Sequence, residues 1–143
     1  TEDSLEVKSS GILHGIEIDM ADMSDLVPTL AVIAVFADSP TRITGVGFIR
    51  QKESDRIGDL VNGLKMIGSD AVEEEDGILI RPVNFDQLHG AELATHDDHR
   101  LAMAWSLLAL RISGISIDEP EVVSKSWPEW WDVRSTLLNV SAN

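Results

Sequence analysis

The chain has 143 residues, a hydrophobic share of 43% and a formal net charge of -14, which predict one folded domain with a core rather than a disordered segment. The negative charge argues against nucleic acid or an anionic membrane as a partner. No apolar run approaches the roughly 20 residues of a membrane span, and the acidic start does not resemble a signal peptide. The lack of cysteine excludes disulfides and thiolate metal sites, and we expect a cytoplasmic protein.

The start of the chain predicts two short strands and then one buried helix. The strands run from Leu5 to Lys8 and from Ile16 to Asp19, the second with alternating apolar and acidic residues. The helix has Ser24 or Asp25 as its candidate N-cap and Pro28 in its first turn, and an almost wholly apolar run follows.

The middle of the chain predicts a strand, a second helix and a hairpin. The strand runs from Arg42 to Val46, and the helix from about Lys52 to Met66, with Gly68 suited to its C-cap. Apolar residues recur at helical spacing on the core face of this helix: Ile57, Leu60, Val61, Leu64 and Ile67. The hairpin joins Ala71–Glu74 to Ile78–Arg81 around Asp76-Gly77, a strong turn signal.

The pattern then starts again, with three matches in order that lie 71 to 75 residues later. The matched segments are His14-Gly15-Ile16-Glu17-Ile18 with His89-Gly90-Ala91-Glu92-Leu93, Leu30-Ala31-Val32 with Leu101-Ala102-Met103, and Lys52 with Lys125 before the helix opened by Pro128. We expect one α/β domain over 1–143 built from repeated βαβαββ units, about 10–83 and 86–143. The second copy lacks a closing hairpin, so the sequence looks cut from a longer one.

The most informative run is Arg50-Gln51-Lys52-Glu53-Ser54-Asp55-Arg56. On a helix, Lys52 and Arg56 lie one turn apart on the same face with Glu53 beside them. Cations at a helix start suit a phosphate or carboxylate ligand. Taken alone, however, this run favours an exposed helix start with ordinary ion pairs.

A second run of polar residues, Thr95-His96-Asp97-Asp98-His99-Arg100, leads into an apolar helix. Asp97 or Asp98 can cap that helix and place His99 and Arg100 in its first turn, where a cation opposes the helix dipole unless an anion binds. A metal site at His96, Asp98 and His99 matches no standard zinc spacing. We therefore expect no metal and no cofactor.

Two further segments carry candidate residues. Asp25 lies at a strand-to-helix junction, where a capping role is the default. Lys125 lies in Ser124-Lys125-Ser126-Trp127-Pro128, and we expect Trp127 and the later tryptophans to pack rather than to stack on a ligand. We assign His14 and His89 to turns.

The four segments together resemble the EPSP synthase family. The run from Arg50 to Arg56 resembles the family's Arg-x-Lys-Glu-(Ser/Thr)-Asp-Arg signature, and Asp97 to Met103 resembles its Asp-His-Arg-x-Ala-Met segment. The segments around Asp25 and Lys125 resemble those with the catalytic aspartate and the late Lys-(Ser/Thr)-aromatic-Pro element. In two departures, Phe48 stands where some members have an asparagine that touches the shikimate phosphate, and Trp127 stands where Phe or Tyr is usual.

The resemblance implies a two-lobed transferase whose lobes each hold three βαβαββ units of the enolpyruvyl transferase fold. This chain would be about two units of the C-terminal lobe, and the missing N-terminal lobe would be its partner. The implied reaction moves the enolpyruvyl (1-carboxyvinyl) group of phosphoenolpyruvate to the 5-hydroxyl of shikimate 3-phosphate. It belongs to the shikimate pathway of chorismate and aromatic amino-acid biosynthesis, and we expect the segment alone to be inactive.

The resemblance also implies roles for individual residues. Asp25 would lie near the shikimate 5-hydroxyl, and Lys52 and Glu53 at the reacting centre, with Asp25 and Lys52 also contacting shikimate 3-phosphate. The group that handles the proton at C3 can be either Lys52 or Glu53. The residues that would hold phosphoenolpyruvate are Arg56, Arg100 and Lys125, with His99 adjacent.

Two rival functions remain open from the sequence. One is the sister enzyme that transfers enolpyruvyl to UDP-N-acetylglucosamine, and the Lys-Glu-Ser-Asp-Arg and Asp-His-Arg runs favour the shikimate enzyme over it. The other is a non-catalytic anion-binding module of the same fold. Every catalytic position carried over from the family retains a suitable residue, which argues against such decay.

Overall fold

A four-stranded mixed sheet forms the base of the molecule in the computed structural model, which describes residues 6, 8–9 and 11–140. The strands are β1 (Glu17–Asp19), β2 (Thr41–Thr44), β3 (Asp70–Glu74) and β4 (Gly77–Arg81), in the order β1-β2-β4-β3. β1 and β2 are parallel, and the other neighbours are antiparallel. The mixed sheet with helices confirms the predicted α/β class.

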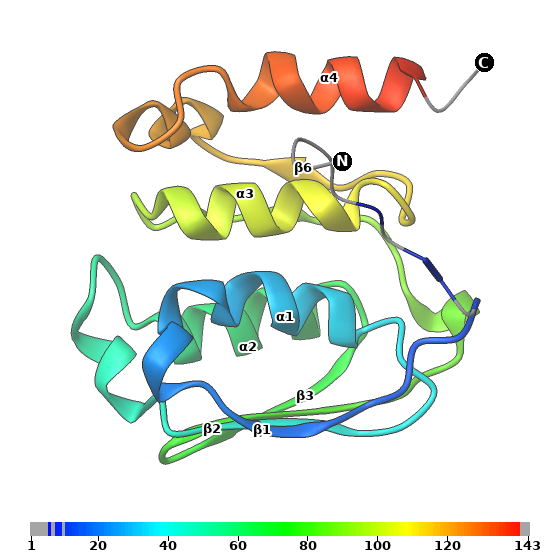
Figure 1. Ribbon diagram of the computed structural model, residues 1–143, viewed down its shortest axis with the longest axis vertical. Coiled ribbons are helices and arrows are strands. Elements are labelled where there is room, and N and C mark those ends of the chain that lie inside the picture. The colour runs from blue at the N-terminus through cyan, green and yellow to red at the C-terminus, as the bar shows by residue number, and fades with distance from the viewer. Residues whose placement is uncertain (1–5, 7, 10, 141–143) are drawn as a thin grey trace.

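Two helices, α1 (Val27–Ala34) and α2 (Arg56–Met66), lie on one face of this sheet (Figure 1). The predicted core face of α2 is confirmed, because the five apolar residues predicted for it are buried, the last of them, Ile67, directly after the helix. α2 ends in a Schellman-type C-cap, in which Gly68 N–H donates to Lys65 O and Ser69 N–H donates to Leu64 O. Gly68 has a φ of 87°, a left-handed conformation that suits glycine.

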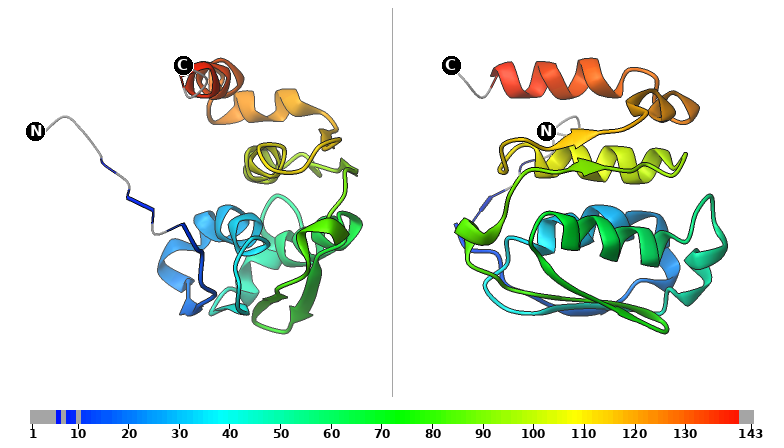
Figure 2. Two further views of the ribbon diagram at one scale, coloured as in Figure 1. Left: turned by 90° about the vertical axis from the view of Figure 1, so that its right-hand side faces the viewer. Right: turned by 180° about the vertical axis from the view of Figure 1, so that it is seen from behind.

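A second region stacks on these helices. It consists of β5 (Glu92–Leu93), α3 (His99–Leu108), β6 (Ser116–Ile117), a 3-10 helix (Pro120–Lys125) and α4 (Trp130–Val140). β5 and β6 form a parallel two-stranded sheet. Figures 1 and 2 show α3 between the α1–α2 layer and the layer of β6 and α4. α3 therefore joins the two regions.

Three further 3-10 helices connect main elements in the described part of the chain, and two of them correct the predicted helix starts. They are Ala21–Leu26, Gly47–Gln51 and Phe85–Gln87. The first leads into α1, so Leu26 is the N-cap and neither Ser24 nor Asp25 caps that helix. The second is followed by irregular chain up to Asp55, whose carboxylate caps α2 by accepting from Gly58 N–H at 3.1 Å. Lys52 thus precedes the helix, and the prediction that it shares a helical face with Arg56 is wrong.

The remaining elements agree closely with the predicted ones. The strand over Ile16 to Asp19 and the hairpin are confirmed, although the two loop residues of the hairpin are Glu75-Asp76 and Gly77 already pairs in β4. Of the strand predicted from Leu5 to Lys8, Leu5 and Val7 lie outside the described residues, and Lys8 has no regular structure. The internal duplication stays a prediction. None of the described helices is long and apolar enough to cross a membrane.

Candidate active site

The guanidinium of Arg56, in the first turn of α2, is surrounded by three carboxylates. Its Nε donates to Asp98 Oδ2 at 2.7 Å and its Nη2 donates to Glu53 Oε2 at 2.6 Å. Its Nη1 donates to Asp25 Oδ1 at 3.4 Å, the longest of the three contacts. The side chain is only 1% exposed, so these charge-assisted bonds replace water as its partners.

Asp98 connects the two helices that carry the site arginines. One carboxylate oxygen accepts from Arg56, and the other caps α3 by accepting from Arg100 N–H at 2.8 Å. The predicted capping role is thereby confirmed for Asp98. The side chain is fully buried, so this single carboxylate fixes the start of α3 against the start of α2.

Asp25 is held between two arginines and has no capping role, contrary to the default interpretation. Its Oδ2 accepts from Arg100 Nη2 at 2.7 Å, while its Oδ1 faces Arg56. Its side chain is 51% exposed, so a ligand can reach it from solvent. Two guanidinium groups directed at one accessible carboxylate form a site suited to carboxylate or phosphate chemistry.

A cleft of about 310 Å³ opens beside this pair. Its lining combines the polar groups of Asp25 and Arg100 with apolar and aromatic side chains; the residues are Asp25, Leu26, Thr29, Arg100, Met103, Leu107, Ser126, Trp127 and Trp130. Trp127 and Trp130 pack edge to face at 5.2 Å, and the prediction that the tryptophans pack rather than stack on a ligand stays a prediction. The cleft thus has a charged floor and an apolar wall.

Lys125 contacts Asp97 in the loop that precedes α3. Its Nζ pairs with Asp97 Oδ1 at 2.5 Å and donates to Asp97 O at 3.1 Å. Its side chain is 47% exposed. Asp97 and the preceding His96 both have left-handed backbone conformations, with φ of 58° and 50°. The loop therefore presents Asp97 to Lys125 while Asp98 turns inward.

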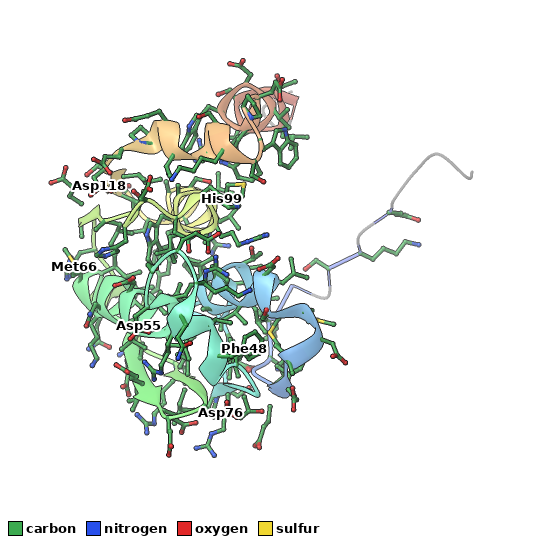
Figure 3. The ribbon with its side chains drawn as sticks, turned by 90° about the vertical axis from the view of Figure 1, so that its left-hand side faces the viewer. Phe48, Asp55, Met66, Asp76, His99 and Asp118 are labelled. Carbon is green, nitrogen blue, oxygen red and sulfur yellow. The ribbon has the colours of Figure 1, made fainter. Side chains whose placement is uncertain are left out.

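His99 and Lys52 do not contact the Arg56 cluster through any hydrogen bond or ion pair found among the described residues. His99 is buried at the start of α3 (Figure 3), and its Nδ1 has no hydrogen-bond partner within the described part of the chain. Lys52 is exposed, with its Nζ 5.9 Å from the centre of the Phe48 ring. Within the same described ranges, no three histidine, aspartate or glutamate residues are placed to hold a metal ion.

The segment with Lys52 and Glu53 is fixed by contacts that the sequence did not reveal. Arg50 donates to Glu73 at 2.6 Å, to Asp55 at 3.2 Å and to the carbonyl of Glu74 at 2.9 Å. Burial lowers the pKa of Arg50, but the bond to Glu73 and the charge of Asp55 outweigh it and raise the pKa above its usual value. Asp76, in the hairpin loop, accepts from the backbone of the same segment.

The sequence therefore predicted most of the residues around Arg56 but not the buried bond between Asp98 and Arg56. Asp25, Glu53, Arg56 and Arg100 are brought together by direct contacts. The sequence offers Asp98 as a helix cap but does not predict its bond to Arg56, because Arg56 lies 42 residues away in the sequence. The roles assigned to the site residues stay predictions.

A family model for EPSP synthase (3-phosphoshikimate 1-carboxyvinyltransferase) matches residues 1–133 of the chain. Proteins named 3-phosphoshikimate 1-carboxyvinyltransferase are similar to it. The one from Methanoculleus marisnigri is 44% identical over 130 residues, which are 91% of this chain and 30% of that protein. The one from Rhizobium etli is 43% identical over 124 residues, which are 85% of this chain and 30% of that protein.

A solved structure of EPSP synthase from Acinetobacter baumannii superimposes with a TM-score of 0.79 at 36% sequence identity. The match covers 87% of this chain and 30% of that one. The chain thus spans about 30% of the length of the curated relatives it matches.

Proposed function

This chain belongs to the EPSP synthase family, and on that premise we propose that the protein carrying it transfers an enolpyruvyl group from phosphoenolpyruvate to the 5-hydroxyl of shikimate 3-phosphate. The products are 5-enolpyruvylshikimate 3-phosphate and inorganic phosphate. The reaction is part of the shikimate pathway, which leads to chorismate and the aromatic amino acids, and the proposal includes a cytoplasmic location.

One observation carries this proposal: Arg56 of α2 and Arg100 of α3 converge on the accessible carboxylate of Asp25 beside a cleft. Phosphoenolpyruvate has a carboxylate and a phosphate on one small carbon skeleton, and forked guanidinium donors match both groups. The hydroxyl that attacks needs a base within hydrogen-bond reach, and Asp25 offers a carboxylate at the same place. Binding and proton transfer can therefore occur side by side.

The proposed chemistry has two steps. In the first, the 5-hydroxyl oxygen bonds to C2 of phosphoenolpyruvate, Asp25 takes the hydroxyl proton, and C3 gains a proton, which gives a tetrahedral intermediate. In the second, the bond from C2 to the phosphate oxygen breaks, C3 loses a proton and the double bond returns. We assign the protons at C3 to Glu53 together with Lys52, since Glu53 lies against Arg56.

The cations act mainly on charge. Arg56 and Arg100 offset the charge of the bound carboxylate and of the departing phosphate, and Lys125 adds a third cation beside the α3 loop. Because Asp98 holds Arg56 and the start of α3 together, the two guanidinium groups need little rearrangement when substrate arrives. The proposed site is thus organised before binding.

The rest of the protein supplies the remainder of the site in this proposal. Asp25 is half exposed, and several large apolar side chains on the described surface, among them Ile33, Leu110 and Trp127, are at least 40% exposed. Such a surface suits a contact with further parts of the same polypeptide. We therefore expect the isolated segment to fold, to bind substrates weakly and to have no turnover.

Phosphate release from phosphoenolpyruvate by the complete protein tests the reaction, with shikimate 3-phosphate and UDP-N-acetylglucosamine offered in parallel. Release with shikimate 3-phosphate alone is the expected result. Release only with the nucleotide sugar would replace the acceptor while keeping the chemistry. No release with either acceptor, from a folded protein, would favour a binding module.

A matched pair of variants tests the role of Asp25. Asp25→Asn removes the proposed base, and we expect the rate to fall by about 10²- to 10⁴-fold. Asp22→Asn makes the same exchange in the same 3-10 helix but at an exposed position outside the cluster, and we expect the rate to stay unchanged. Equal rates for the two variants would remove Asp25 from the chemistry.

A further inference from the structure

The loop of the β3–β4 hairpin lies against the segment that carries Lys52 and Glu53. That segment begins as the 3-10 helix Gly47–Gln51 and has no regular structure from Lys52 to Asp55. Irregular chain takes its geometry from the elements around it, since it lacks a repeating hydrogen-bond ladder. The contacts that the hairpin makes here therefore act on the backbone that carries Lys52 and Glu53, in addition to the bond between Glu53 and Arg56.

Asp76 binds the start of the segment through three bonds. Its carboxylate accepts from Gly45 N–H at 3.0 Å and from Gly47 N–H at 2.8 Å. Its backbone carbonyl accepts from Val46 N–H at 3.1 Å. The approach is close, because a Cβ on Gly47 would lie 2.9 Å from Asp76 Oδ1. One loop residue thus accepts from three successive N–H groups of the chain that leads to Lys52. Figure 3 shows Asp76 in the same part of the molecule as Phe48, which follows these three residues.

Arg50 binds the end of the segment to the same hairpin. Its guanidinium donates to two residues of β3, Glu73 at 2.6 Å and the carbonyl of Glu74 at 2.9 Å. It also donates to Asp55 at 3.2 Å, at the end of the segment. Asp55 in turn caps α2, the helix that begins with Arg56. The hairpin itself packs against the hydrophobic core through Ala71, Ile78 and Ile80, which are buried. The hairpin therefore contacts the start of the irregular segment through Asp76 and reaches its end, Asp55, through Arg50.

We propose that Asp76 and Arg50 are positioning residues for the transfer reaction, which fix the Lys52–Glu53 segment from the hairpin without touching substrate. This inference rests on the proposed function. Neither residue forms a hydrogen bond or ion pair with Asp25, Arg56 or Arg100 within the described part of the chain. Their effect must therefore pass through the backbone to Lys52 and Glu53.

The test compares Asp76→Ala and Asp76→Asn in the complete protein. Asp76→Ala removes the two carboxylate bonds and keeps only the backbone bond to Val46 N–H. The reacting groups are then displaced, and we expect kcat to fall by about 10- to 100-fold while the KM for phosphoenolpyruvate changes little. Asp76→Asn keeps one carbonyl oxygen as acceptor, so we expect it to recover part of that loss. Arg50→Gln provides an independent variant at the other end of the segment, should Asp76→Ala fail to fold.

The matched control is Asp70→Ala, at the opposite end of the same hairpin. Among the described residues, the Asp70 side chain pairs with Arg81 alone, at 3.3 Å and with both side chains about half exposed. We therefore expect its removal to leave the segment in place. We expect kcat for this variant to equal that of the unaltered protein. Rates are measured well below the melting temperature of every variant, so that an altered kcat reports geometry rather than the folded fraction.

A double-mutant cycle separates positioning from a general structural effect. If Asp76 acts through Glu53, adding Asp76→Ala to Glu53→Gln should lower kcat far less than it does alone. Fully additive losses, or an unchanged kcat in both Asp76→Ala and Arg50→Gln, would overturn the inference while the proposed function stands. No turnover by the unaltered protein would overturn the proposed function and the inference with it.

Discussion

The four-stranded region and the two-stranded region of this molecule differ in how much of a core they possess. The first region packs α1 and α2 on a sheet of four strands closed by a hairpin, and most of the buried apolar residues belong to it. The second has strands of only two residues each and its own small cluster of Ala102, Val122 and Val123. Its helix α3 instead contributes Leu101, Trp105 and Leu108 to the core of the first region.

The cations of the proposed site follow the same division. Arg56, from the first region, is buried among three carboxylates, whereas Lys125, from the second, is half exposed with Asp97 as its partner. A buried charge depends on its partners for stability, whereas an exposed pair contributes little. The buried part of the site is therefore anchored in the first region and extended by the second.

The strongest test of this division removes the buried partner of Arg56. Asp98→Ala removes the fully buried carboxylate from Arg56 Nε, leaves Glu53 and Asp25 on the other two nitrogens, and uncaps α3. We therefore expect the free energy of unfolding to fall by about 3–5 kcal/mol. Urea unfolding of the complete protein measures the loss. The control Asp70→Ala breaks an exposed pair, and we expect it to cost less than about 1 kcal/mol. Similar values for both variants would remove the energetic distinction between buried and exposed charges.

The next effect concerns binding at the boundary between the regions. Arg100→Lys keeps the charge but loses the forked donor that now holds Asp25. The loss of a charge-assisted bond worth about 1.5–3 kcal/mol predicts a rise of about 10- to 100-fold in the KM for phosphoenolpyruvate. Steady-state kinetics of the complete protein measure it. An unchanged KM together with an unchanged kcat would contradict the assignment of Arg100 to this substrate.

Local signals allowed much of the fold to be predicted, and long-range contacts explain the errors. The core face of α2, the hairpin and the Asp98 cap depend on residues close in sequence, and all three are confirmed. The start of α2 was misplaced because Arg50 and the N–H of Gly58 both engage Asp55, which favours a cap there over a helix from Lys52. Periodicity alone carries no information about that competition.

The candidate site shows the same limit. The motifs pointed to Asp25 and Arg100, but Asp25 was first interpreted as a cap because its partners lie 31 and 75 residues away. Likewise, the contact of Asp76 with Gly45 and Gly47 joins a hairpin loop to a segment about 30 residues earlier, with no periodic signal between them. Such contacts emerge only when the elements are packed.

A smaller effect is expected where the two regions touch through helices. Gly63 of α2 faces Trp105 of α3, and a Cβ on Gly63 would lie 2.7 Å from the indole ring. Gly63→Ala should therefore destabilise the protein by about 1–3 kcal/mol through overpacking, offset in part by the higher helix propensity of alanine. Asn62→Ala is the control, one residue earlier at an exposed position, and thermal unfolding compares the two. Stabilisation by Gly63→Ala would mean that α2 and α3 separate at little cost.

The smallest effect on stability is expected at Lys125, because its pair with Asp97 is exposed and screened by salt. Lys125→Ala should change the free energy of unfolding by less than about 1 kcal/mol. It should nevertheless raise the KM for phosphoenolpyruvate, because it removes a cation proposed to bind this substrate. Asp97→Asn is the counterpart: asparagine tolerates the left-handed backbone at this position, and the change frees Lys125 from its carboxylate. This variant should leave KM unchanged or lower it. If both variants raised KM equally, the ion pair itself, rather than the charge of Lys125, would shape the substrate site.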